Sequence, residues 1–136
     1  MTVLVDSNVL IDVAAADPVW GEWSRRALDQ AGASESLIVN PIIYAEVSVA
    51  FERIEEVEAV LPTASFKREQ IPYEAAFLAG KAYLAYRRRG GSSGSPLPDF
   101  FVGAHAVVSG HRLLTRDARL YRTYFPRLGI IAPDDA

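Results

Sequence analysis

Four carboxylates of this 136-residue chain lie among apolar residues, where an acid is costly unless something compensates its charge. One follows the β-branched run at 2–5, and another follows the apolar run at 112–115. A third lies on the apolar stripe of a predicted helix, and the fourth opens a helix that is apolar nearly all round. Each acid alone is equally compatible with a helix cap, a turn or an internal ion pair. Together they indicate one site, and in chain order they are Asp6, Glu46, Asp99 and Asp117.

The chemistry of such a site follows from the repulsion between its members. Like charges about 4 Å apart repel by roughly 4 kcal/mol per pair at an effective dielectric constant near 20. A few such pairs consume most of a domain's net stability of about 5–15 kcal/mol, so a convergent cluster must hold protons or bind a cation. The chain has no cysteine and only two histidines, which excludes thiolate metal sites and disfavours a His-rich zinc site. Oxygen ligands favour Mg²⁺ or Mn²⁺, and an ion of this kind activates water for phosphodiester hydrolysis.

The elements that must position these acids alternate along the chain between strands and helices, which predicts a parallel α/β sheet with its site at the carboxyl edge. The length suits a single domain over residues 1–136. A Gly- and Ser-rich loop is expected over 90–96. The predicted strands are 2–5, 36–39, 65–67, 112–115 and 129–131. One helix is predicted to start near residue 7. The other predicted helices cover 18–30, 41–49, 53–61, 73–89, 99–109 and 117–121.

Charge is distributed unevenly between the two halves of the chain. Residues 1–66 hold three arginines and eleven acids, whereas residues 67–136 hold eleven basic residues and six acids. This pattern fits two solvated faces of opposite sign, or a basic surface that receives a polyanion beside an acidic site. The basic run Arg87–Arg89 either contacts phosphates or complements the dipole of its own helix. The preferred substrate contacts lie just past the strand at 112–115 and are Arg116, Arg119 and Arg122.

Several motifs now form an ordered set that spans the chain. The set consists of Val5-Asp-Ser-Asn-Val-Leu-Ile-Asp12, Glu46, Pro98-Asp-Phe-Phe-Val-Gly-Ala-His-Ala106 and Leu114-Thr-Arg-Asp117. With it the sequence resembles the PIN domain and, within that family, the VapC toxin ribonucleases of type II toxin–antitoxin modules. No single motif is specific for this family, but the order and spacing of the whole set in so short a chain are specific for it.

The resemblance implies a three-layer PIN-like sandwich, with a mainly parallel central sheet of about four or five short strands flanked by helices. It implies a Mg²⁺- or Mn²⁺-dependent endoribonuclease that acts on structured RNA such as tRNA or ribosomal RNA. The four carboxylates would form the metal site, and Asn8 and Thr115 would orient and support the first of them. A cognate antitoxin and a homodimer are the expected partners. No signal peptide is recognisable, and the longest apolar run is about half a membrane span, so a cytoplasmic location is expected.

Other interpretations remain open. A catalytically silent RNA-binding PIN module would carry the same motifs. A haloacid-dehalogenase-type phosphatase needs Asp-x-Asp after its first strand, where this chain has Asp6-Ser-Asn8, and a phosphoacceptor receiver domain needs a late lysine that the chain lacks. His105 lies about 240° round its helix from Asp99, which favours a packed core histidine over a catalytic one. Asp12 is interpreted as a helix-surface or structural acid outside the site.

Overall fold

A five-stranded, all-parallel sheet forms the centre of the computed structural model, which describes residues 1–91 and 97–133. Most of the loop expected over 90–96 therefore lies outside the described residues. The strands are β1 (Thr2–Val5), β2 (Ser36–Val39), β3 (Phe66–Arg68), β4 (Arg112–Leu114) and β5 (Ile130–Ile131). They follow the order β3-β2-β1-β4-β5, which places β1 in the middle. The three last residues of β1 are fully buried, as expected of a strand covered on both faces.

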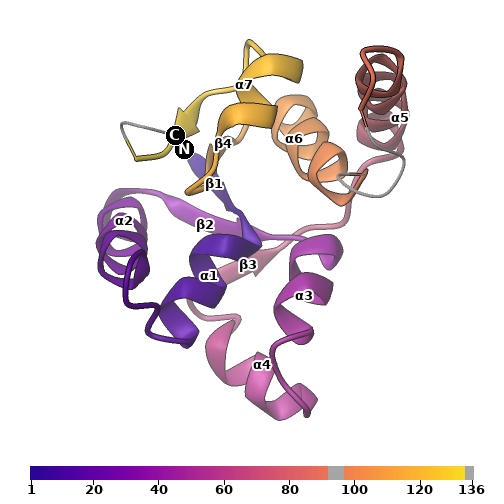
Figure 1. Cartoon of the computed structure of the whole chain (residues 1–136). Helices are drawn as coiled ribbons and strands as arrows, with labels where there is room; N and C mark the ends of the chain where they lie inside the picture. The colour runs from indigo at the N-terminus through magenta and orange to yellow at the C-terminus, as the bar shows by residue number, and fades with distance from the viewer. Residues whose placement is uncertain (92–96, 134–136) are drawn as a thin grey trace.

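Helices cover this sheet on both sides, with α2 and α6 on opposite sides and α5 packed along α6 (Figure 1). The predicted α/β class with a parallel sheet flanked by helices is confirmed. No described helix is long and apolar enough to cross a membrane. The helices are α1 (Ser7–Ala14), α2 (Gly21–Ser34), α3 (Pro41–Ser48), α4 (Ile54–Val60), α5 (Tyr73–Arg88), α6 (Leu97–Ser109) and α7 (Arg119–Tyr124).

The order of the strands reverses beside β1. The chain moves outward from β1 to β2 and β3, then returns through α5 and α6 to add β4 and β5 on the other side of β1. Val5 of β1 pairs with Leu114 of β4 at the carboxyl edge of the sheet. Ligands of open α/β sheets bind at such a reversal, because the loops that leave the two strands diverge there. The acids that follow β1 and β4 therefore face a ready-made crevice.

Several helix boundaries differ from the sequence-based predictions. α2 begins at Gly21 and not at Pro18, and it continues past Gly32 to Ser34. A Cβ at Gly32 would lie 3.3 Å from the side chain of Leu37, so the glycine lets α2 pack close to β2. α6 begins at Leu97, so Asp99 lies within its first turn and does not cap it. The last helix starts at Arg119 and not at Asp117, since Ala118 takes the capping position. These shifts leave each acid at the place in the fold where it was expected.

Candidate functional site

Asp6 lies at the carboxyl end of β1 and caps α1. Its Oδ1 accepts the backbone N–H of Ser7 (2.8 Å), and its Oδ2 accepts the hydroxyls of Thr115 (2.9 Å) and Tyr121 (3.0 Å). The residue is only 4% exposed. Burial raises the pKa of Asp6 even though all three hydrogen bonds favour the ionised form. The carboxylate is fixed in place, and no cationic side chain in residues 1–91 and 97–133 is bonded to it.

Glu46 of α3 and Asp99 of α6 approach the same region from two other elements. Glu46 is half-buried, and its Oε1 accepts the hydroxyl of Ser7 at 2.9 Å. Burial raises the pKa of Glu46, and the charge of Asp6 adds to the effect. Burial, followed by the charges of Asp6, Glu46 and Asp117, raises the pKa of Asp99 to about 7. Asp6, Asp99 and Asp117 line one cavity, and Ser7 connects Glu46 to Asp6, so the structure brings all four predicted acids together.

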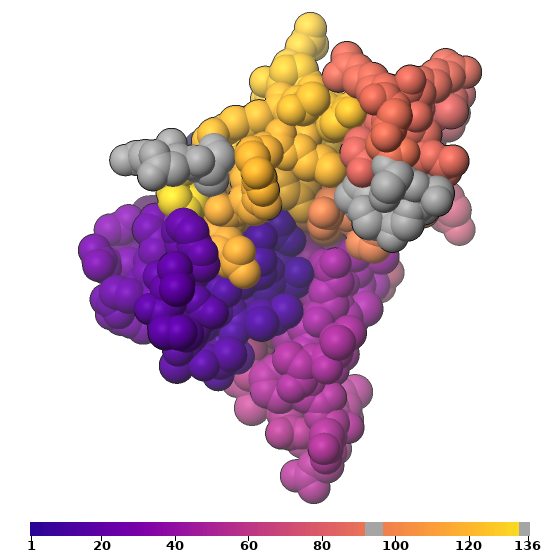
Figure 2. All heavy atoms as spheres, in the orientation of Figure 1, coloured from indigo at the N-terminus to yellow at the C-terminus, as the bar shows by residue number. Residues whose placement is uncertain are grey.

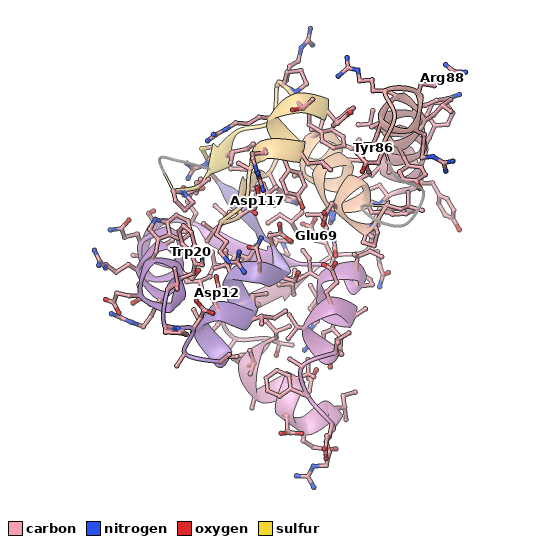
Figure 3. All side chains as sticks on the ribbon, viewed as in Figure 1. Asp12, Trp20, Glu69, Tyr86, Arg88 and Asp117 are labelled. Atoms are coloured by element: carbon pink, nitrogen blue, oxygen red, sulfur yellow. The ribbon has the colours of Figure 1, made fainter. Side chains whose placement is uncertain are left out.

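Asp117 differs from the other three acids because it has a cationic partner. It follows β4 and is bound by Arg119, whose Nε lies 3.1 Å from Asp117 Oδ1. Hydrogen bonding to this guanidinium holds the pKa of Asp117 below its usual value. Figure 3 shows Asp117 near the centre of the molecule, and Figure 2 shows that the N-terminal part, the α3 segment and the C-terminal part meet there. The pocket at this place has a volume of about 520 Å³ and is lined by Asp6, Ser7, Asn8, Asp99, Asp117, Arg119, Leu120 and Tyr121. We call this cavity, with its three lining acids and the adjacent Glu46, the acidic pocket.

Asn8 and Thr115 lie where a supporting pair is expected. Asn8 Nδ2 donates to Thr115 Oγ1 (3.2 Å), and the backbone N–H of Asp117 donates to the same oxygen (3.2 Å). Both lone pairs of the hydroxyl are then used, so its proton is directed to Asp6. The backbone N–H of Arg116 donates to Asn8 Oδ1 (3.3 Å), which fixes the orientation of the amide. The loop after β4 is thereby tied to the first carboxylate.

The structure gives the predicted arginines different surroundings. Arg116 Nε donates to Asp12 Oδ2 (2.7 Å), and its guanidinium lies over the ring of Trp20 at 5.9 Å. Asp12 is 3% exposed, so its interpretation as a surface acid is wrong and its structural role is supported. Asp12 and Trp20 lie to one side of the acidic pocket in Figure 3. Arg119 lines the pocket, and Arg122 is exposed on α7. Their contact with a substrate remains a prediction.

With this geometry established, the chain can be compared with known proteins. The sequence matches the PIN domain over residues 3–126. The chain belongs to the PIN domain family. No curated protein matches its sequence.

Solved structures with the same fold include several toxin–antitoxin complexes. Rickettsia felis VapBC2, bound to a DNA fragment from its promoter, matches with a TM-score of 0.75 and 15% identity, over 98% of this chain and 100% of that chain. VapBC-1 of nontypeable Haemophilus influenzae matches with a TM-score of 0.72 and 18% identity, over 97% and 98%. Mycobacterium tuberculosis VapC20, described as a toxin that cleaves the sarcin–ricin loop, matches with a TM-score of 0.63 and 13% identity, over 89% and 94%. At these identities the likeness establishes a shared fold.

Sequence reasoning missed two residues of this PIN domain's pocket. Ser7 links Asp6 to Glu46, because its backbone binds one carboxylate and its hydroxyl binds the other. Tyr121 donates to Asp6 from α7, and its burial depends on the packing of that short helix against α6. A Cβ at Gly103 of α6 would lie 2.5 Å from the ring of Phe125 and 3.1 Å from that of Tyr121. The absence of a side chain at Gly103 therefore allows α7 and Phe125 to pack close to α6, and the sequence did not reveal which side chains would approach there.

A second polar cluster of this PIN domain consists of Glu69, His105 and His111, and we call it the histidine cluster. Glu69 Oε1 lies 3.2 Å from His105 Nε2 and 2.7 Å from His111 Nε2. Both imidazoles are buried, as predicted for His105. Asn40 Oδ1 accepts the N–H of Ile43, so Asn40 Nδ2 donates to His105 Nδ1 (2.9 Å). The proton of neutral His105 must then lie on Nε2, where it is donated to Glu69.

The two clusters differ in their suitability for a metal ion. The ligand atoms of the histidine cluster lie within 4.8 Å of one another, but a metal at His105 Nε2 would require a proton on Nδ1, facing the amide donor of Asn40. The acidic pocket offers carboxylate oxygens from four elements, three of them without a cationic partner among the contacts described above. Hard divalent cations prefer such oxygen ligands. The residues of the acidic pocket therefore fit Mg²⁺ or Mn²⁺.

Proposed function

We propose that this PIN domain is a Mg²⁺- or Mn²⁺-dependent endoribonuclease of the VapC type, with the ion held by Asp6, Glu46, Asp99 and Asp117. One observation supports it above the others, namely the excess of carboxylate in a partly buried pocket. Of the residues that line this pocket and are described by the structure, Arg119 is the single cation, and it pairs with Asp117. A divalent ion would relieve the remaining repulsion.

The residues of the pocket have distinct tasks in this proposal. Thr115 and Tyr121 hold Asp6 in one orientation, and Ser7 holds Glu46 next to it. A bound divalent ion would supply an activated water and neutralise charge on the phosphate. Asp99, with a pKa of about 7, carries a proton when the pocket holds no cation and releases it near neutral pH. Binding of a divalent ion by Asp6, Glu46, Asp99 and Asp117 would therefore displace the proton of Asp99 to solvent.

RNA phosphates would be bound at the rim of the pocket by Arg116, Arg119 and Arg122. Arg116 uses Nε on Asp12, and its side chain is about one-third exposed, which leaves its two Nη groups for bidentate phosphate binding in this proposal. Arg119 lies directly on the pocket wall. The substrate we propose is structured RNA, either tRNA or ribosomal RNA. It is supported by VapC20, which has the same fold and is described as a sarcin–ricin loop cleaving toxin.

The proposed protein partners are a cognate antitoxin and a second copy of the chain in the cytoplasm. The antitoxin is supported by the solved structures with this fold, which are described as VapBC complexes. Co-expression with the product of the adjacent reading frame, followed by co-purification, tests the antitoxin. Light scattering of the purified chain tests the homodimer.

The decisive assay for this function is RNA cleavage by the purified protein. We expect cleavage of tRNA or ribosomal RNA with Mg²⁺ or Mn²⁺, loss of cleavage in EDTA, and recovery when the ion is returned. Asp6→Asn and Asp99→Asn should remain folded and lose cleavage. The matched control is Asp29→Asn, because Asp29 is an exposed acid of α2 paired with Arg25.

Two results would contradict the proposal. If Asp6→Asn or Asp99→Asn cleaves at the wild-type rate, the site is assigned wrongly. If the wild-type protein binds RNA but leaves it intact with either ion, the catalytically silent RNA-binding module is the better description.

A further inference from the structure

Tyr121 is a buried phenol in the wall of the acidic pocket. It lies on α7 and is 2% exposed, and its hydroxyl donates to Asp6 Oδ2 at 3.0 Å. α7 is close enough for this contact because Gly103 of α6 leaves room for the rings of Tyr121 and Phe125. Burial, followed by the charges of the carboxylates around the phenol, keeps the pKa of Tyr121 well above its ordinary value. The hydroxyl therefore remains a donor at every working pH.

The acceptor sites of Asp6 can be assigned one by one. A carboxylate has about four lone-pair sites, two on each oxygen. Oδ2 accepts both Thr115 and Tyr121, so its two sites are used. Among the described residues, Oδ1 accepts only the backbone N–H of Ser7, which leaves one site open. Asp6 can therefore offer a cation one oxygen, Oδ1, without breaking a hydrogen bond.

We propose that Tyr121 is a positioning residue of the metal site, which saturates Asp6 Oδ2 and so presents Asp6 to a divalent cation through Oδ1 alone. This inference rests on the proposed function of the acidic pocket. Residues that hydrogen-bond to metal ligands restrict ligand orientation, and their loss typically weakens metal binding about 10- to 100-fold.

The test is the affinity of the metal-free protein for Mn²⁺, measured by electron paramagnetic resonance of the free ion. Tyr121→Phe keeps the ring that packs against α6 and removes only the hydroxyl, and we expect its Kd for Mn²⁺ to rise about tenfold. The matched control is Tyr124→Phe. Tyr124 lies on the same helix, packs its ring on Phe100 at 5.4 Å, and has no hydroxyl hydrogen bond among the residues that the structure describes. This control should bind Mn²⁺ as tightly as the wild type.

A second variant separates positioning from a general structural role. 4-Aminophenylalanine placed at position 121 returns an N–H donor to the para position, and we expect it to restore the Kd to within about threefold of wild type. If Tyr121→Phe fails to fold, the amino analogue still tests the inference through its own Kd for Mn²⁺. Equal Kd values for wild type and Tyr121→Phe, or no recovery with the amino analogue, would overturn this inference alone. An absence of Mn²⁺ binding by the wild-type protein would instead overturn the proposed function.

Discussion

The acidic pocket and the histidine cluster are both partly buried groups of titratable side chains, but they differ in their balance of hydrogen-bond donors and acceptors. In the histidine cluster, two imidazole N–H groups face one carboxylate, and a threonine hydroxyl and an asparagine amide satisfy the outer nitrogens. In the acidic pocket, four carboxylates share hydroxyl and backbone donors and one guanidinium. The first group satisfies its own hydrogen-bonding atoms, whereas the second leaves carboxylate oxygens in excess.

This difference shows that proximity of metal-ligand residue types is a weak indicator of a metal site. Glu69, His105 and His111 are close enough to surround an ion, yet the tautomer fixed by Asn40 already uses the nitrogen of His105 that an ion would need. A surplus of acceptors is the more informative property, because only a proton or a cation removes it. The two clusters should therefore respond in opposite ways to substitution and to pH.

The largest effect is expected from Asp99→Asn. Cleavage should fall more than about a hundredfold, because a lost metal ligand costs more than the 10- to 100-fold typical of a residue that only supports one. Unfolding free energy in EDTA should rise at the same time, since a buried carboxylate that repels three neighbours becomes neutral. Cleavage assays measure the loss of activity, and urea unfolding measures the change in unfolding free energy. Loss of activity together with loss of stability would contradict the functional assignment and support a structural role.

The opposite pattern is expected from His105→Leu. This change leaves Glu69 with one imidazole donor fewer and Asn40 Nδ2 without its acceptor, so the unfolding free energy should fall by about 2–4 kcal/mol. Cleavage per folded molecule should remain within about twofold of wild type, because the two clusters share no described hydrogen bond. Urea unfolding and assays well below the melting temperature check this. A catalytic defect in a stable variant would mean that the histidine cluster takes part in the reaction.

The pH dependence of stability should have opposite signs in the two clusters. Burial and the neighbouring charges raise the pKa of Asp99 from 3.8 to about 7, so the folded state binds this proton more tightly and its stabilising effect is lost as the pH rises through 7. Burial lowers the pKa of His105 below 6.5, so its neutral form is favoured and stability is lost as the pH falls below that value. Urea unfolding in EDTA between about pH 5 and 8 measures both effects. The unfolding free energy of the wild type should fall relative to that of Asp99→Asn as the pH rises, and relative to that of His105→Leu as the pH falls. Parallel curves would refute the assignment of either group.

The smallest effect is expected from Arg119→Gln. The Arg119–Asp117 ion pair is exposed, with 82% and 48% of the two side chains accessible, so its loss should change the unfolding free energy by less than about 1 kcal/mol. Thermal unfolding in EDTA measures this. A larger loss would show that the pair is needed to hold the loop after β4, and that the charge of Asp117 is not screened by solvent.

Much of the fold was predictable from the sequence because its signals are local. Short apolar runs ending in Asp6 or near Asp117 marked the buried strands, and Pro41 after Asn40 marked the start of a helix whose cap the structure shows. The four acids were identifiable because a carboxylate among apolar neighbours is conspicuous in the sequence itself. These features depend on residues within a few positions of one another.

The remaining features depend on contacts between distant parts of the chain. Tyr121 reaches Asp6 across 115 residues, and Glu69 reaches the two histidines across 36 and 42 residues. Neither contact leaves a periodic signal, because each arises where separate helices and strands pack together. The sequence left Asp12 as either a helix-surface or a structural acid for the same reason, since its partner Arg116 lies 104 residues away. Side-chain partners of this kind become visible only in the folded structure.

The central claim is that the acidic pocket binds a divalent cation, and calorimetric titration of the metal-free protein with Mn²⁺ tests it most directly. We predict that the wild type and His105→Leu bind Mn²⁺ with equal affinity, and that Asp99→Asn binds it at least about tenfold more weakly. Equal binding by Asp99→Asn, or a loss of binding confined to His105→Leu, would contradict the claim.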